Sequence, residues 1–135
     1  MAPSKKVVIA GSASLQNEIH QWIDYWNTQK GHKVIDFPKF IPQEGFHEIY
    51  PKIHHEFFKN LRKANLLFVA NENKNGIVGY VGAETFAEAA FVVSENLIDR
   101  KKIKVLLRQM PSPKVQSFDE IRLWLKLGWI QIMEK

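Results

Sequence analysis

Short, continuous apolar runs alternate along the chain with longer stretches in which apolar residues recur every three or four positions. Continuous runs rich in Val, Ile and Leu are typical of strands buried on both faces of a sheet, and the longer spacing is typical of helices with one buried face. The runs predict strands at 7–10, 33–37, 66–70 and 103–107, and a short fifth strand at 129–133. The spacing predicts helices at about 14–30, 46–61, 83–97 and 117–127.

Turn-forming residues mark where these elements end. Gly31 and Gly128 follow the first and last helices in the position of a C-terminal cap, and Pro51 predicts a kink or a restart in the second helix. Ser117 and Glu120 have the Ser-x-x-Glu spacing of a capping box, which predicts the start of the last helix.

The order of elements, with strand and helix in alternation, predicts an α/β fold. Because crossovers between parallel strands are right-handed, we expect a three-layer α/β/α sandwich with a doubly wound, mainly parallel sheet of five strands, of the flavodoxin-like or Rossmann-like kind. No repeat, low-complexity segment or linker interrupts the pattern, so residues 1–135 are expected to form a single domain.

Composition excludes several classes of protein. The longest apolar run, residues 64–70, is interrupted by Asn65 and is far shorter than the roughly 20 residues of a membrane-spanning helix. The absence of cysteine excludes disulfides, thiolate metal ligands and a cysteine nucleophile, and it fits a reducing compartment. Since the N-terminus also lacks the apolar stretch of a secretory signal, we expect a cytoplasmic protein with no membrane partner.

The net charge of +5 permits an anionic ligand such as a phosphate or a nucleotide. The densest basic group consists of Arg100, Lys101, Lys102, Lys104 and Arg108. Part of it lies on a predicted strand, where alternate side chains point to opposite faces, so it does not form one patch. Nucleic acid is therefore not expected as a partner.

Loops at the carboxyl ends of the strands are the expected ligand sites of a doubly wound sheet. They lie here at 11–14, 71–82 and 108–113. In the first, backbone N–H groups and the hydroxyls of Ser12 and Ser14 can hold a phosphate, or one serine can simply cap the following helix; both interpretations stay open. The chain contains no Walker motif and no Gly-x-Gly-x-x-Gly sequence.

The loop at 71–82 combines glycines with the side-chain amides of Asn71 and Asn73. Asparagine and glycine are also good turn formers, so composition alone does not assign a function. A loop of this length is uncommon in a compact domain, which favours a functional role.

The predicted helix at 83–97 is the most informative element. Glu84, Glu88 and Glu95 lie on one side of it, opposite Phe86, and Phe91 lies on the same side as the glutamates. A face exposed to solvent would be more polar, so we expect Glu84 and Glu88 to line a cavity or a subunit contact. Two carboxylates one turn apart can divide acid and base roles, because their repulsion raises one pKa.

The histidines and tryptophans are assigned structural roles. His54 and His55 are adjacent, and adjacent helical residues point about 100° apart, so the pair does not readily share a metal ion. No other ligand cluster stands out, and no metal site is predicted. The four tryptophans are expected to pack in the core: Trp22, Trp26, Trp124 and Trp129.

Three segments in order carry a resemblance to a known family. They are the strand ending in Ala10-Gly11, residues 64–71 with the sequence ANLLFVAN, and residues 79–90 with the sequence GYVGAETFAEAA. Together they resemble the nucleoside 2-deoxyribosyltransferase-like superfamily, and most of all its small members with a Gly-Tyr-hydrophobic-Gly run. The resemblance covers about residues 5–110 and is carried mostly by 64–90.

The resemblance implies an enzyme that cleaves the bond between a base and a ribose or deoxyribose, as a transferase or a hydrolase, without a cofactor. Glu88 matches the family's nucleophile, which attacks the anomeric carbon, and Glu84 is a candidate acid or base. The residues implied to contact phosphate, sugar or base of a nucleoside or nucleotide are Gly11, Ser12, Ser14, Asn71, Asn73, Tyr80 and Gly82.

The sequence departs from the family pattern in its acidic residues. Active members usually carry an aspartate six residues before the nucleophile, in an Asp-x-Gly-Thr pattern; here Gly82 stands there, and Glu84 replaces the glycine before Thr85. This motivates an alternative, a catalytically silent nucleotide-binding or sensor module. A third reading, a flavodoxin-like or receiver-like domain, would need a flavin or an acidic cluster at the strand ends, where Asp36 stands alone.

Relatives in that superfamily are commonly dimers or larger. The apolar flanks of the helix at 83–97 and the aromatic pair Trp124 and Trp129 are predicted to form a twofold contact. The expected assembly is therefore a homodimer or a larger homo-oligomer.

Overall fold

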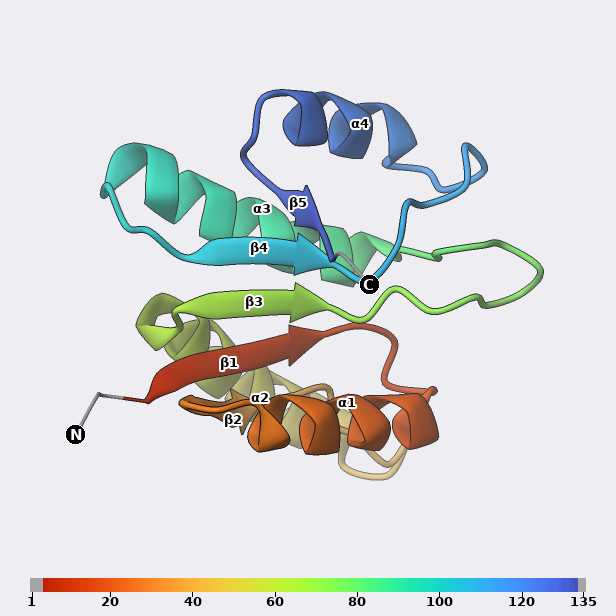
Figure 1. Ribbon diagram of the computed structural model, residues 1–135. Coiled ribbons are helices and arrows are strands. Elements are labelled where there is room, and N and C mark those ends of the chain that lie inside the picture. The colour runs from red at the N-terminus through yellow and green to blue at the C-terminus, as the bar shows by residue number, and fades with distance from the viewer. Residues whose placement is uncertain (1–3, 134–135) are drawn as a thin grey trace.

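The computed structural model describes residues 4–133. Strands and helices alternate along the chain (Figure 1). Their bounds are β1 Lys5–Ala10, α1 Gln16–Thr28, β2 His32–Asp36, α2 Phe46–Lys63, β3 Leu66–Val69, α3 Ala83–Ile98, β4 Lys104–Leu107, α4 Phe118–Lys126 and β5 Gln131–Ile132.

The five strands form one parallel sheet in the order β2-β1-β3-β4-β5. The central register pairs Val7 with Leu66, and Leu66 with Lys104. The predicted fold class, a doubly wound sheet between layers of helices, is confirmed. This strand order is the flavodoxin-like one. Successive strands are added on one side of β1 and then, from β3 onward, on the other side, and this switch opens a crevice at the carboxyl ends of β1 and β3.

Helices cover the two faces of the sheet unequally. Phe57 of α2, Val92 of α3 and Ile121 of α4 belong to one hydrophobic cluster on one face of the sheet. On the other face, α1 contributes Trp26 to a cluster with Val7, Ile9 and Phe68. Because successive strand residues point to opposite faces, each apolar strand contributes to both clusters.

The helix termini differ from their predicted caps. Ser117 precedes α4 as predicted, but its hydroxyl is buried and makes no hydrogen bond within the described residues, so the capping box with Glu120 does not form. Neither Ser12 nor Ser14 caps α1: the cap position is Leu15, which has no side-chain acceptor, and the serine hydroxyls contact each other at 2.9 Å. The serine-cap interpretation of this loop is therefore wrong.

Two further expectations were only partly met. Pro51 lies within α2, which runs without a restart from Phe46 to Lys63. The helix continues although the proline removes the one hydrogen bond that an N–H at this position would donate to the His47 carbonyl. Trp26 is buried as predicted, but Trp129, which lies between α4 and β5, is 37% exposed. Within residues 4–133, no helix is both long and apolar enough to cross a membrane.

Candidate active site

A cavity of about 250 Å³ opens at the carboxyl ends of the strands, where the connections from β1 and β3 leave toward opposite faces of the sheet. Segments from four parts of the chain surround it: the loop after β1, residues 37–41 after β2, the middle of α2, and the loop and helix that follow β3. Its volume lies just below the roughly 300–1,000 Å³ of typical ligand pockets, so it suits one small molecule.

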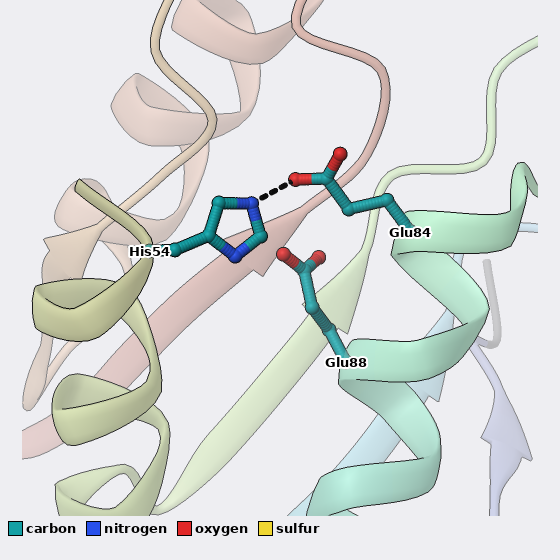
Figure 2. Close-up of side chains that lie close together, drawn as sticks. All are labelled: His54, Glu84 and Glu88. Atoms are coloured by element: carbon teal, nitrogen blue, oxygen red, sulfur yellow. Dashed lines mark hydrogen bonds and ion pairs between the residues drawn. The ribbon is translucent and has the colours of Figure 1, made fainter. Parts of the chain in front are cut away.

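Glu88 is the most buried titratable residue of this cavity. Its neighbours on the same face of α3, among them Ala89 and Val92, pack into the core, so the helix carries the Glu88 side chain below the surface with only 6% exposed. Its carboxyl group points toward the gap between α3 and α2 (Figure 2). Within residues 4–133, no group donates a hydrogen bond to it.

This environment disfavours the charged form of Glu88. Desolvation by burial raises the pKa of its carboxyl group to about 8, and the negative charges of Glu84 and Asp36 add to the effect. Glu88 therefore holds a proton at neutral pH. Positive charge placed beside it would favour the carboxylate instead.

Glu84 and His54 form a pair at the mouth of the cavity. Glu84 lies one helical turn before Glu88, and its carboxylate contacts His54 Nε2 of α2 at 2.5 Å (Figure 2). The imidazole ring packs between Tyr50 and Phe58, with ring centroids 4.1 and 5.8 Å away, which fixes its direction. Desolvation raises the pKa of the Tyr50 phenol, and the charges of Glu84 and Glu88 raise it further.

A second carboxylate close to the cavity, that of Asp36, is paired with a positive charge. Asp36, at the end of β2, is 4% exposed, forms an ion pair with Lys39 and accepts a hydrogen bond from Asn60 at 2.8 Å. Lys39 lines the cavity from this side. Among the described strands, Asp36 is the acidic residue at a carboxyl end, and its charge is paired with Lys39. The described residues therefore form no receiver-like acidic cluster at the strand ends.

The opposite rim carries hydroxyls and a lysine. Lys74 reaches across from the loop after β3 and donates a hydrogen bond to Ser12 Oγ at 2.6 Å, while its ammonium lies 5.4 Å from the centre of the Tyr80 ring. Gly82 begins α3 in an extended conformation with no side-chain cap. The N-terminus of α3 and the lysine together make this rim favourable for an anion.

The structure brings together six of the nine residues predicted for the site. Gly11, Ser12, Tyr80, Gly82, Glu84 and Glu88 all line the cavity. Ser14 does not line it, although its hydroxyl contacts that of Ser12. Asn71 and Asn73 do not line it either.

Asn71 is a structural residue. It is 1% exposed, and its amide oxygen accepts hydrogen bonds from the backbone N–H groups of Arg108 and Gln109, at 2.9 and 3.3 Å. Its amide nitrogen donates to the carbonyls of Gln109 and Gly79. Asn73 likewise accepts a hydrogen bond from the Gly79 N–H at 3.0 Å. These side chains tie the loop 71–82 to the end of β4 and are not available to a ligand.

Replacing Asn71 by alanine is expected to lower the free energy of unfolding by about 2–4 kcal/mol, because buried N–H and C=O groups then lose their partners. Urea denaturation of Asn71→Ala measures the loss. Asn17→Ala, on the exposed face of α1, is the control and should change stability by less than about 0.5 kcal/mol. Equal stability of the two variants would contradict the structural role.

Three titratable residues of the cavity were not predicted: His54, Lys39 and Lys74. The argument that His54 and His55 cannot share a site holds, since His55 is exposed and points elsewhere. His54 instead contacts the carboxylate of Glu84 on α3, which lies 30 residues further along the chain. Its place four residues from Tyr50 and from Phe58, on one aromatic stripe of α2, was the available signal.

The third glutamate of α3 takes no part in the cavity. Glu95 pairs with Arg62 of α2 at 2.6 Å and lies 3.8 Å from Lys101. The glutamate side of α3 therefore faces α2, as its unexpected apolar content indicated, and Phe91 packs on Phe58 there. Leu97, on the opposite side, is 54% exposed.

The surfaces predicted to form a twofold contact are partly buried within the chain and partly exposed. Trp124 stacks on Phe86 with ring centroids 5.1 Å apart and is partly buried within the chain. Exposed apolar residues remain on α3, α4 and the segment after it, namely Leu97, Ile98, Leu123, Leu127 and Trp129. Homo-oligomerisation through them stays a prediction.

A scan against protein-family models gave no match to this chain, and a search of curated proteins gave none either. The function must therefore be argued from the cavity itself.

Proposed function

We propose that this protein cleaves the bond between the base and the ribose or deoxyribose of a nucleoside or nucleotide, as a transferase or a hydrolase, with Glu88 as nucleophile. The observation that carries the proposal is the buried Glu88 carboxyl group, which receives no hydrogen bond from residues 4–133, at the inner end of a cavity that suits one small molecule. An oxocarbenium-like transition state develops positive charge on the sugar, and a buried carboxylate stabilises that charge strongly.

The reaction needs two steps at Glu88. Glu88 first passes its proton to the neighbouring His54 and Glu84 pair. The carboxylate so formed attacks C1′ as the bond from C1′ to the base nitrogen breaks, and the electron pair of that bond leaves with the base. Water or an acceptor base then attacks C1′, and the ester oxygen returns to Glu88 as carboxylate. Approach of the developing positive charge offsets the cost of ionising Glu88 inside the cavity.

The departing base also needs a proton. The His54 and Glu84 pair is close to Glu88, is accessible from the cavity mouth and can carry a proton on the imidazole or the carboxylate. We assign the acid role to this pair. In the second step, the same pair accepts the proton that water releases.

The basic rim suits the phosphate of a nucleotide. Lys74 and the Ser12 hydroxyl lie together beside the N-terminus of α3, and charge-assisted hydrogen bonds from these groups would hold a 5′-phosphate. The apolar residues Ile41, Ile53 and Phe57 on the α2 side offer a surface for the base.

A second function, nucleotide binding without turnover, is favoured by one observation at Gly82. A Cβ atom added there would lie 3.4 Å from the Tyr80 ring and from its hydroxyl, so Tyr80 occupies the space beside the position where active relatives of the resembling superfamily carry aspartate. A site that has replaced this acid by a phenol could retain the ligand and lose the chemistry.

Liquid chromatography of released base decides between these functions. The purified protein is incubated, in buffer with a chelator, with ribo- and deoxyribonucleosides and their 5′-monophosphates, each with and without an acceptor base. Release supports the enzyme, and its dependence on the acceptor separates a transferase from a hydrolase. Measurable binding of the same nucleotides with no release would support the silent module.

Replacing Lys74 by methionine is expected to raise the KM for 5′-monophosphates by about tenfold and to leave the KM for nucleosides unchanged, because one charge-assisted hydrogen bond to phosphate is lost. Lys63→Met, at the exposed end of α2, is the matched control and should alter neither value. If Lys74→Met weakened both substrate classes equally, the phosphate would not lie at this rim.

A further inference from the structure

His54, Glu84 and Glu88 form a cluster of one imidazole and two carboxylates. One potential ligand atom from each residue lies within 4.8 Å of the other two. Two of the side chains come from successive turns of α3 and the third from the facing α2 (Figure 2). We propose that these three residues bind a divalent transition-metal ion, with zinc as the best fit.

The geometry is close to that of a bound ion. Oxygen and nitrogen ligands lie about 2.0–2.2 Å from zinc, so two ligands of a tetrahedral ion are roughly 3.5 Å apart. Separations of up to 4.8 Å require side-chain movements of about an ångström, which the long glutamate side chains allow. Three protein ligands leave the fourth position to water, and the cavity provides room for it.

The electrostatics of Glu88 are a separate observation in favour of a cation. Its carboxyl group is more than nine-tenths buried, faces the cluster and receives no hydrogen bond from residues 4–133. The two nearby lysines are engaged elsewhere, Lys39 with Asp36 and Lys74 with Ser12. A bound cation supplies the missing partner.

The ligand types select among ions. A neutral imidazole favours zinc, copper, nickel or iron, whereas magnesium and calcium prefer all-oxygen sites. Aromatic neighbours hold the imidazole, since Tyr50 and Phe58 pack against its two sides. The site is therefore expected to bind Zn²⁺ and not to bind Mg²⁺ at the same concentration.

This inference goes beyond the proposed function and does not need it, because metal binding is measured without nucleotide. The ion would engage the carboxylate oxygen that attacks C1′ in the proposed reaction. Zinc and catalysis by Glu88 would then exclude each other, and for this reason the base-release assay contains a chelator.

Calorimetric titration of the chelator-treated, dialysed protein with Zn²⁺ tests the site. We expect one equivalent to bind to the wild type, and at least about tenfold weaker binding to His54→Ala, Glu84→Gln and Glu88→Gln. His55→Ala is the matched control, since the neighbouring exposed histidine should not contribute. Mg²⁺ should give no binding heat.

A second measurement guards against a variant that is poorly folded. Thermal unfolding in chelator establishes that each variant is folded, and a Zn²⁺ concentration that just saturates the wild type should raise the Tm of the wild type and of His55→Ala clearly more than that of His54→Ala. Absence of one-equivalent binding to the wild type would overturn the proposal. So would wild-type affinity in His54→Ala, or an equal loss in His55→Ala.

Discussion

Glu88→Gln should lower the rate of base release by about 10³-fold or more, because an amide oxygen cannot form the glycosyl ester and carries no charge to stabilise the sugar cation. The glutamine has nearly the same shape, so the cavity and the nucleotide affinity should be retained. Liquid chromatography measures the rate, and calorimetry with the same nucleotide measures the affinity.

Glu95→Gln is the matched control for this variant. Glu95 lies on the same side of the same helix, but its partners are Arg62 and Lys101, away from the cavity. Its rate of base release should equal that of the wild type. A wild-type rate in Glu88→Gln would remove Glu88 from the nucleophile role, and loss of both rate and affinity would place it in binding alone.

The same substitution should stabilise the fold at alkaline pH. The Glu88 pKa is about 8 in the folded chain against an ordinary value of 4.5, so the folded state holds the proton more tightly than the unfolded state. Stability contributed by this group is therefore complete below the ordinary value and is lost as the pH rises toward 8. A shift of this size corresponds to about 3–5 kcal/mol above pH 8.

Urea denaturation at pH 5 and pH 9, in chelator, measures this effect. The gain of Glu88→Gln over the wild type should be small at pH 5 and reach several kcal/mol at pH 9. Comparing the two proteins removes the contribution of other titrating groups. Glu95→Gln should show no such gain, and a pH-independent difference for Glu88→Gln would mean that Glu88 is not desolvated as described.

These two results belong together. A carboxyl group that destabilises its own fold and serves a ligand is one form of the exchange of stability for function that active sites commonly show. Higher stability with lower turnover in one variant would be the signature of such a site.

The strands and helices were predictable because each depends on a local pattern. The β-branched run at 7–10 and the helical spacing from Phe46 to Leu61 identify their elements without reference to the rest of the chain. The termini were less predictable. β1 begins two residues earlier, at Lys5, because pairing with β2 extends it. Ser117 does not form its capping box because its backbone, with φ −90° and ψ 16°, is not in the extended conformation of a capping residue.

The residues of the candidate site also differ in whether a local sequence pattern predicts their positions. Glu84 and Glu88 could be placed together because the helical period sets their relation. His54 could not, since its contact depends on how α2 packs on α3. Asn71 was misassigned because an asparagine that binds a ligand and one that satisfies backbone groups look alike in sequence, and only the positions of Gly79 and Gln109 tell them apart.

The hydrogen bonds of Asn71 also decide how a ligand can enter and leave. They make the wall formed by the loop 71–82 part of the rigid sheet, so its amide protons should exchange with solvent slowly. The facing segment 38–45 has fewer side-chain anchors, namely the ion pair of Lys39 with Asp36 and the hydrogen bond from the Gln16 amide to the Pro38 carbonyl at 3.1 Å. Movement of the segment 38–45 should therefore limit how fast a ligand enters and leaves the cavity. Substitutions in this segment should change the association and dissociation rates of the ligand more than its affinity.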